Sequence, residues 1–179
     1  MHIRIISGKY KGRRITAPKN LPIRPTTDRA KEALFNILNN DRHFPELKVL
    51  DLFTGSGSIS YEFASRGTKD IQAVDQNYPV IKFIKQTAQE FDFPIKAIKK
   101  NALKFLENTP ETYDIIFADP PYEMPKEWQS KLINTVFDRN LLKENGMMIL
   151  EHKEQINFDK HPHFDKSKKY GKSVFSFFK

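Results

Sequence analysis

The sequence contains no cysteine, so it can form neither disulfide bonds nor thiolate metal sites. It has no apolar run long enough to cross a membrane, and its first residues are too polar and basic for a secretory signal. No internal repeat is present. These absences argue against disulfide-stapled, membrane-spanning and repeat proteins. They make the cytoplasm the expected compartment.

The residues that are present fit one soluble domain. The chain has 179 residues, 39% of them hydrophobic, which is enough for a sizeable core. Short runs rich in β-branched and aromatic residues predict strands at 47–53, 71–74, 95–98, 113–118, 147–150 and 173–178. Helical spacing of apolar residues predicts helices from Thr27 or Asp28 to Leu38, from the glycine loop to about Arg66, at 80–91, just after 101, and at 126–137. This alternation predicts an α/β fold with a doubly wound, mostly parallel sheet, which an antiparallel hairpin closes.

The net charge of +8 comes from one end of the chain. Residues 1–31 hold nine Lys and Arg but a single acid, Asp28, whereas the remaining residues hold 21 basic and 21 acidic side chains. A basic patch of this kind is the expected footprint of a polyanionic partner, most simply a nucleic acid. A solvated basic arm is the plainer alternative, and the complete asymmetry between the two segments weighs against it.

The first 25 residues are predicted to form a basic extension to a main domain at 26–179. Residues 3–6 and 13–17 flank a segment with two glycines, which indicates a β-hairpin. Tyr10 lies among cations in this segment, so it could stack on a base while they hold phosphates. Arg24 and Arg29, next to the first helix, could also contact RNA phosphates. The predicted nucleic-acid contacts are Arg4, Lys9, Tyr10, Lys11, Arg13, Arg24, Arg29 and Pro121.

A glycine loop and an acid together predict a nucleoside site. The loop follows the strand at 47–53, and Asp75 ends the next strand, where it could bind ribose hydroxyls. A dinucleotide would fit the same pattern. However, Ser60 replaces the third glycine of the dinucleotide motif, and Asp51 would repel a pyrophosphate. S-adenosylmethionine has no phosphate and carries an ammonium and a sulfonium, so these acids favour it over a nicotinamide cofactor.

Asn101 is either an adenine contact or the N-cap of the helix that follows it. Phe53 and Ala102 are candidate walls of the same site. The predicted cofactor-binding residues are Asp51, Phe53, Thr54, Gly55, Ser56, Gly57, Asp75, Asn101 and Ala102.

The stretch Asp119-Pro120-Pro121-Tyr122 follows the buried strand 113–118. In an open α/β sheet, ligands bind at the carboxyl ends of the strands. The Asp119 carboxylate and the Pro120 carbonyl can accept both hydrogens of an exocyclic amine and aim its lone pair at a methyl donor. Tyr122 could stack on the base. This reaction needs neither a metal nor a shifted pKa at Asp119. A plain proline-rich turn is the alternative for Asp-Pro-Pro alone.

These motifs resemble a known family. The loop at 51–57 looks like the S-adenosylmethionine loop of class I methyltransferases, and the stretch 119–122 looks like the motif of their amino-methylating branch. The blocks at 5–12, 24–29 and 31–38 are similar to the RsmD family of bacterial small-subunit rRNA guanine-N2 methyltransferases. The resemblance covers nearly the whole chain, although 152–169 matches poorly.

The resemblance implies a Rossmann-like seven-stranded methyltransferase sheet with an N-terminal RNA-binding hairpin. It implies that S-adenosylmethionine is the cofactor and that a guanine of 16S rRNA is the substrate, with or without bound ribosomal proteins. We expect a monomer with no metal. Two alternatives stay open: an N6-adenine methyltransferase acting on DNA or RNA, and a non-catalytic RNA-binding assembly factor.

Overall fold

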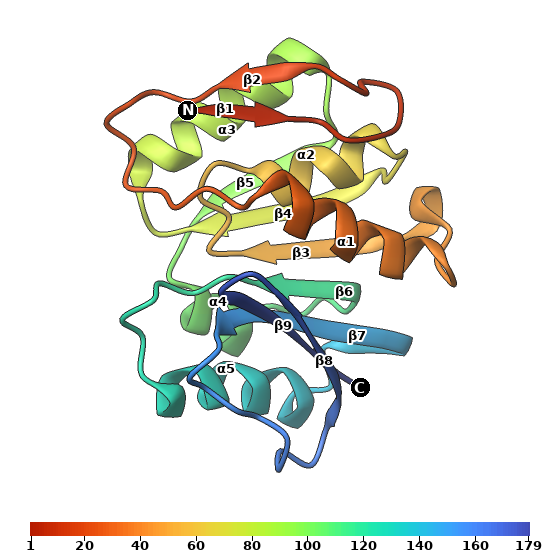
Figure 1. Cartoon of the computed structure of the whole chain (residues 1–179), viewed down its shortest axis with the longest axis vertical. Coiled ribbons are helices and arrows are strands. Elements are labelled where there is room, and N and C mark those ends of the chain that lie inside the picture. Colours follow the sequence, from red (N-terminus) through yellow and green to blue (C-terminus); the bar gives the residue numbers. More distant parts are fainter.

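A computed structural model describes all residues 1–179 and contains two sheets (Figure 1). The larger has seven strands, in spatial order β5 (Ile95–Lys99), β4 (Asp70–Asp75), β3 (Lys48–Leu52), β6 (Tyr113–Ala118), β7 (Leu142–Lys153), β9 (Ser173–Phe178) and β8 (Phe164–Tyr170). The first five run parallel, and β9 pairs antiparallel with both β7 and β8. The predicted doubly wound sheet and its closing hairpin are confirmed.

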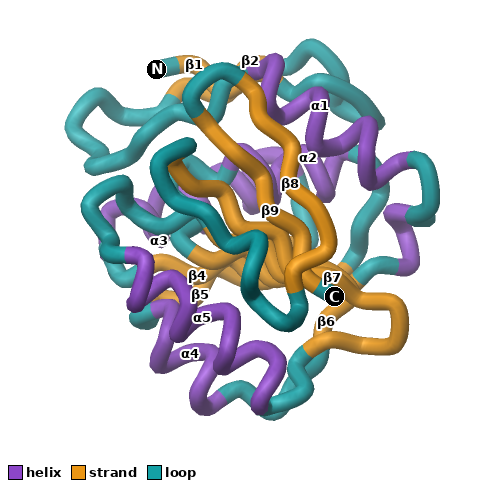
Figure 2. Tube along the Cα trace, turned by 60° about the horizontal axis from the view of Figure 1, so that its bottom comes forward, coloured by secondary structure: helices purple, strands orange, loops and turns teal.

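Helices cover both faces of this sheet. One group is α1 (Asp28–Asn39), α2 (Ser58–Ser65) and α3 (Tyr78–Phe91), the other is α4 (Ala102–Asn108) and α5 (Lys126–Asp138), and a short helix η1 (Phe44–Glu46) precedes β3. Alternate residues of β6 face the two groups: Ile115 and Phe117 pack with α1 and α2, and Ile116 and Ala118 with α4 and α5. Figure 2 shows these groups on opposite sides of the strands. None of the helices has the length and apolar character needed to cross a bilayer.

Two strands differ from the sequence expectation. The strand predicted at 147–150 is much longer, since β7 runs from Leu142 to Lys153. β8 was not predicted at all, because its sequence FDKSKKY is polar and lacks an alternating apolar pattern. It lies at the edge of the sheet, where lysines are common because they discourage pairing with other chains.

The smaller sheet is the predicted N-terminal hairpin. β1 (His2–Arg4) pairs antiparallel with β2 (Arg14–Thr16). The apolar side chains Ile3, Ile5 and Ile15 share a core with α3, which lies beside the hairpin in Figure 1. The division into residues 1–25 and 26–179 therefore crosses a continuous core, and it stays a prediction.

A buried ion pair joins the hairpin to the main domain. The Lys31 side chain on α1 is 1% exposed, and its Nζ donates to the Arg4 carbonyl at 2.6 Å and to Ser58 Oγ at 3.0 Å. Glu62 on α2 lies 3.7 Å from that Nζ and accepts from the backbone N–H of Ile6 at 2.8 Å. Burial lowers the pKa of Lys31, and the Glu62 carboxylate opposes this effect.

Glu62→Gln should destabilise the protein strongly, because it would remove the carboxylate that faces both the buried Lys31 ammonium and the Arg66 guanidinium, whose Nε lies 2.8 Å from Glu62 Oε2. We expect the free energy of unfolding, measured by urea denaturation, to fall by about 3–5 kcal/mol. Asp28→Asn is the control, since it breaks the exposed Arg4–Asp28 pair and should cost about 1 kcal/mol or less. Equal costs for the two variants would show that the buried pair does not hold the hairpin in place.

Candidate active site

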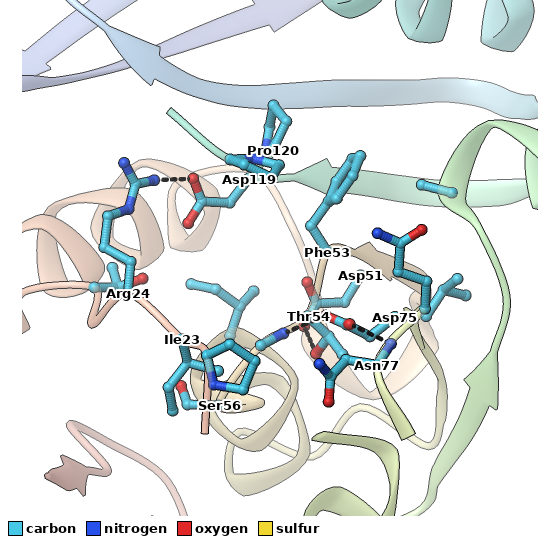
Figure 3. Close-up of a pocket in the computed structure, with 18 of the residues that line it drawn as sticks. Ile23, Arg24, Asp51, Phe53, Thr54, Ser56, Asp75, Asn77, Asp119 and Pro120 are labelled. Carbon is cyan, nitrogen blue, oxygen red and sulfur yellow. Dashed lines mark hydrogen bonds and ion pairs between the residues drawn. The ribbon is translucent and has the colours of Figure 1, made fainter. Parts of the chain in front are cut away.

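A cavity of about 720 Å³ opens at the carboxyl ends of the parallel strands. Its walls come from the loop after β3, the end of β4, the corner after β6 and the segment 21–26 that leads into α1. Figure 3 shows side chains from these segments around one space. The volume lies within the range of ordinary small-molecule sites. All nine predicted cofactor residues except Gly57 are among its lining residues.

The glycine loop turns sharply between β3 and α2. Phe53, Gly55 and Gly57 all have positive φ, at 55°, 54° and 84°. A side chain on Gly57 would come within 2.5 Å of the Tyr61 ring, so only glycine fits there. Gly57 is the N-cap residue of α2. Gly57 therefore sets the conformation of the loop but does not line the cavity.

Two acids hold the loop. Asp51 is buried, and its Oδ2 accepts from Thr54 Oγ1 at 2.7 Å and Ser60 Oγ at 2.6 Å. Burial raises the pKa of Asp51 to about 6, against the two hydroxyl hydrogen bonds, which lower it. Asp75 accepts backbone N–H groups from Gly55 at 3.1 Å and Asn77 at 3.0 Å. Both carboxylates line the cavity and make it electronegative.

Asn101 and Ala102 begin α4 at the far side of the cavity. Asn101 is the N-cap of α4, and its Oδ1 accepts from the Lys104 N–H at 3.1 Å. It also lines the cavity, so the capping role is present and the adenine contact stays a prediction. Ala102, Phe53 and Met124 form an apolar wall of the cavity. Met124 was not predicted from the sequence.

The corner after β6 carries the predicted catalytic residues. The Asp119 side chain is 15% exposed and lines the cavity together with Pro120, Pro121 and Tyr122. The Pro120 carbonyl accepts no backbone hydrogen bond, whereas that of Pro121 accepts from Met124 at 3.0 Å. The Pro120 carbonyl is therefore available to a ligand, and Tyr122 is 41% exposed beside it.

Arg24 does not lie where the sequence suggested. It was expected to contact phosphates, but its Nη2 forms an ion pair with Asp119 Oδ1 (Figure 3). Its guanidinium carbon also lies 3.8 Å from the centroid of the Tyr122 ring. A largely buried carboxylate and an aromatic face attract a guanidinium strongly, which explains this position.

Comparison with known proteins settles the family. The family model described as Conserved hypothetical protein 95 matches residues 3–179. Ribosomal RNA small subunit methyltransferase D of Escherichia coli K12 is 33% identical over 147 residues, covering 82% of this chain and 69% of that protein. The Buchnera aphidicola (subsp. Baizongia pistaciae) protein of the same name is 32% identical over 156 residues, covering 87% and 78%. This chain belongs to the RsmD family.

Solved structures agree on the fold. The structure of Escherichia coli yhhF superposes with a TM-score of 0.84 at 25% identity, covering 99% of this RsmD family member and 97% of that chain. Magnesium protoporphyrin IX methyltransferase from Synechocystis, solved with bound S-adenosylmethionine, has a TM-score of 0.65 at 17% identity, covering 83% and 77%. The Rossmann-like class I methyltransferase fold expected from sequence is confirmed.

Glu151 interacts with the predicted catalytic residue Asp119, although it does not line the cavity and was not predicted from the sequence of this RsmD family member. Ala118 of β6 is the register partner of Leu150 in β7, so Asp119 and Glu151 follow them at the same sheet edge. Glu151 is 4% exposed, and its Oε2 accepts no hydrogen bond from an N–H group, although the Asp119 and Ser173 side chains lie close to the Glu151 carboxyl. The available signal was the same as for Asp119: an acid directly after an apolar run, here 147–150.

The two neighbouring carboxylates influence each other. Burial raises the pKa of Asp119 well above its usual range, the Glu151 charge raises it further, and the Arg24 guanidinium opposes both. Burial likewise raises the pKa of Glu151, and Arg24 again opposes the shift. The predicted reaction does not require a shifted pKa at Asp119, but this arrangement gives Asp119 one.

The predicted RNA contacts of this RsmD family member fall outside the cavity, except Arg24 and Pro121. The side chains Lys9, Lys11, Arg13 and Arg29 are exposed. Arg4 is exposed as well, but it pairs with Asp28.

Tyr10 is not presented for stacking on a base, because its ring packs edge-on against Phe91 and Phe93. Its hydroxyl donates to the Phe91 carbonyl at 2.8 Å. The sequence neighbours of Tyr10 suggested a nucleic-acid contact, but these partners lie far away in sequence.

Asp51→Asn should change how stability depends on pH. The pKa of Asp51 is raised in the folded state, so the folded chain keeps this proton to higher pH than the unfolded chain does. This group therefore lowers stability as pH rises from about 4 to about 6, where the loss levels off. The free energy of unfolding should be measured at pH 4.5 and at pH 7.5. Between these two values it should fall by about 2 kcal/mol less in Asp51→Asn than in wild type.

Asp41→Asn is the control for that measurement, since it makes the same charge change at an exposed position. It should follow the wild-type pH dependence closely. If Asp51→Asn also ran parallel to wild type, the raised pKa would be ruled out.

Proposed function

We propose that this chain transfers a methyl group from S-adenosylmethionine to the N2 amine of a guanine in small-subunit rRNA. The observation that carries the proposal is the pair of acceptors after β6. The Asp119 carboxylate and the Pro120 carbonyl, which accepts no hydrogen bond within the chain, both line the cavity. Membership of the RsmD family supports rRNA as the substrate.

The cavity residues fit the proposed cofactor. Asp51 and Asp75 make the cavity electronegative, which favours the ammonium and sulfonium of S-adenosylmethionine over a pyrophosphate. Asp75 would hold the ribose hydroxyls, as acids do at the end of the second strand of such sheets. Phe53, Asn101 and Ala102 would hold the adenine. When bound, the cofactor supplies an electrophilic methyl group.

The chain's own groups would orient the acceptor and remove its proton. Asp119 and Pro120 would each accept one amine N–H, so that the nitrogen lone pair faces the methyl donor. Tyr122 would stack on the base, a contact worth about 1–3 kcal/mol. The methylated nitrogen carries a positive charge until it loses a proton. The raised pKa of the Asp119–Glu151 pair suits these carboxylates to receive it.

The exposed basic side chains of the hairpin support an RNA partner. Lys9, Lys11 and Arg13 would contact phosphates, and residues 1–25 would act as an RNA-binding extension of the methyltransferase domain at 26–179. We propose a cytoplasmic, metal-free monomer whose substrate is 16S rRNA, either naked or with ribosomal proteins bound.

The function can be tested by methyl transfer from labelled S-adenosylmethionine. Small subunits from cells lacking this protein, and RNA extracted from those subunits, would be the two substrates. Nucleoside analysis should find the label in N2-methylguanosine. Label in N6-methyladenosine would reject the guanine assignment. No label despite measured cofactor binding would mean that the substrate is another molecule, and no cofactor binding by calorimetry would favour a non-catalytic assembly factor.

Asp119→Asn should abolish most turnover and leave cofactor binding largely intact. The amide presents a donor where an acceptor is needed, so kcat should fall by about a hundredfold or more. Glu123→Gln is the matched control, because Glu123 is an exposed acid on the same cavity wall. Calorimetry would compare cofactor binding by the two variants. Full turnover by Asp119→Asn would refute the proposed mechanism.

A further inference from the structure

Arg24 occupies the position that the proposed function assigns to the target base. Its guanidinium pairs with Asp119, the acceptor proposed for the amine. It also lies 3.8 Å from the centroid of the Tyr122 ring, the surface proposed for stacking. Both main contacts of the base are therefore made by a side chain of the protein itself. The Arg24 side chain is 31% exposed, lines the cavity, and comes from the segment before α1.

The Arg24 guanidinium and the edge of guanine that carries N1 and N2 are chemically alike. The N1–C2–N2 edge of guanine is itself a planar guanidine, with N–H donors at N1 and N2 on one side. A carboxylate can accept two parallel N–H bonds from such an edge, as it does from an arginine fork. The corresponding edge of adenine is an amidine that offers an acceptor at N1. A site that holds a guanidinium against a carboxylate and an aromatic ring thus has the polarity that guanine needs.

Glu151 supplies an additional acceptor beside Asp119. It is 4% exposed, and its Oε2 accepts no hydrogen bond from an N–H group of the chain, although the Asp119 and Ser173 side chains lie close enough to interact with the Glu151 carboxyl. A buried carboxylate oxygen without a donor is costly, which makes it a site where a ligand N–H would be gained. Glu151 lies in β7, and its side chain interacts with that of Asp119, which follows the neighbouring strand β6. Glu151 does not line the cavity while Arg24 is in place, so a ligand edge could reach both carboxyl groups only after Arg24 has left.

We propose that Arg24 holds the place of the target base in the RNA-free chain, and that Glu151 accepts the N1–H of guanine once the base displaces Arg24. This inference rests on the proposed function and extends it to the choice between guanine and adenine. Displacement removes the cation that faces the two carboxylates, and the N–H donors of guanine take its place. The freed Arg24 is then available for a phosphate.

The first test measures binding of free guanosine to Arg24→Ala by calorimetry, with no cofactor present. Vacating the site should tighten guanosine binding at least about tenfold over wild type, because the base no longer competes with a tethered guanidinium. Adenosine should gain less than about threefold, since its N1 offers no proton to a carboxylate. Lys82→Ala is the control, because it removes an equal charge from an exposed side chain on α3, outside the cavity, and should behave like wild type.

Methylguanidinium serves as the probe for the contact itself. It should bind Arg24→Ala, compete with guanosine there, and fail to bind wild type at the same concentration. Unchanged guanosine affinity in Arg24→Ala, or no competition by methylguanidinium, would overturn the proposal.

The second test addresses Glu151 with 2-aminopurine riboside, which keeps the exocyclic 2-amine and has an acceptor at N1. In Arg24→Ala, guanosine should bind at least about tenfold more tightly than this analogue, because Glu151 would be left facing a lone pair. Adding Glu151→Gln supplies an amide donor and should reduce or reverse that preference. If the preference for guanosine over 2-aminopurine riboside is unchanged by Glu151→Gln, Glu151 does not contact the N1–H of guanine. The role of Arg24 is then decided by the first test alone.

These measurements are separate from the test of function. They use no methyl transfer, so Arg24→Ala could fail to gain guanosine affinity while wild type still methylates guanine N2 in rRNA. That result would reject the place-holding role alone. Label in a different nucleoside would reject the proposed function and leave the binding result to be judged by itself.

Discussion

The parallel register of the central strands forces negative charge together at one sheet edge. Five parallel strands end there, and four of them carry an acid at or near that end: Asp51 in β3, Asp75 as the last residue of β4, Asp119 just after β6 and Glu151 in β7. Asp51 and Glu151 are almost fully buried, and Asp119 largely so. Carboxylates in such surroundings are stable only if they are protonated, hydrogen-bonded or faced by a cation. The rest of the site meets that requirement.

The four carboxylates are stabilised in different ways. Hydroxyl groups bond to Asp51, backbone N–H groups of the loop bond to Asp75, and the Arg24 guanidinium pairs with Asp119. The buried Oε2 of Glu151 accepts no hydrogen bond from an N–H group of the chain, and the Glu151 carboxyl interacts with the side chains of Asp119 and Ser173. An edge of this kind attracts ligands that bring positive charge or N–H donors. A methyl donor with two cationic centres and a base with a donor edge are both ligands of that type.

Local patterns in the sequence were sufficient to predict much of this structure. The strand at 113–118 and the acid-proline corner after it lie next to each other in the chain, so both could be located from sequence. The glycine loop and Asp75 follow from strand ends in the same way. What could not be predicted depends on partners distant in sequence, such as Phe91 beside Tyr10 or Asp119 beside Arg24. β8 could not be predicted from the sequence, because it forms a strand through hydrogen bonding to β9 and not through its own composition.

The segment that carries Arg24 is fixed at both ends. The Ala17 N–H bonds to the Met1 carbonyl within the hairpin, and Thr27 caps α1. Pro18, Pro22 and Pro25 lie between these points and restrict the segment's conformations. The Arg24 guanidinium therefore acts as an intramolecular ligand with a high effective concentration, set by the length and stiffness of this segment. Lengthening the segment with glycine would dilute that ligand without altering a single contact, so the ease with which the site opens is encoded in a connector and can evolve independently of the residues that perform the chemistry.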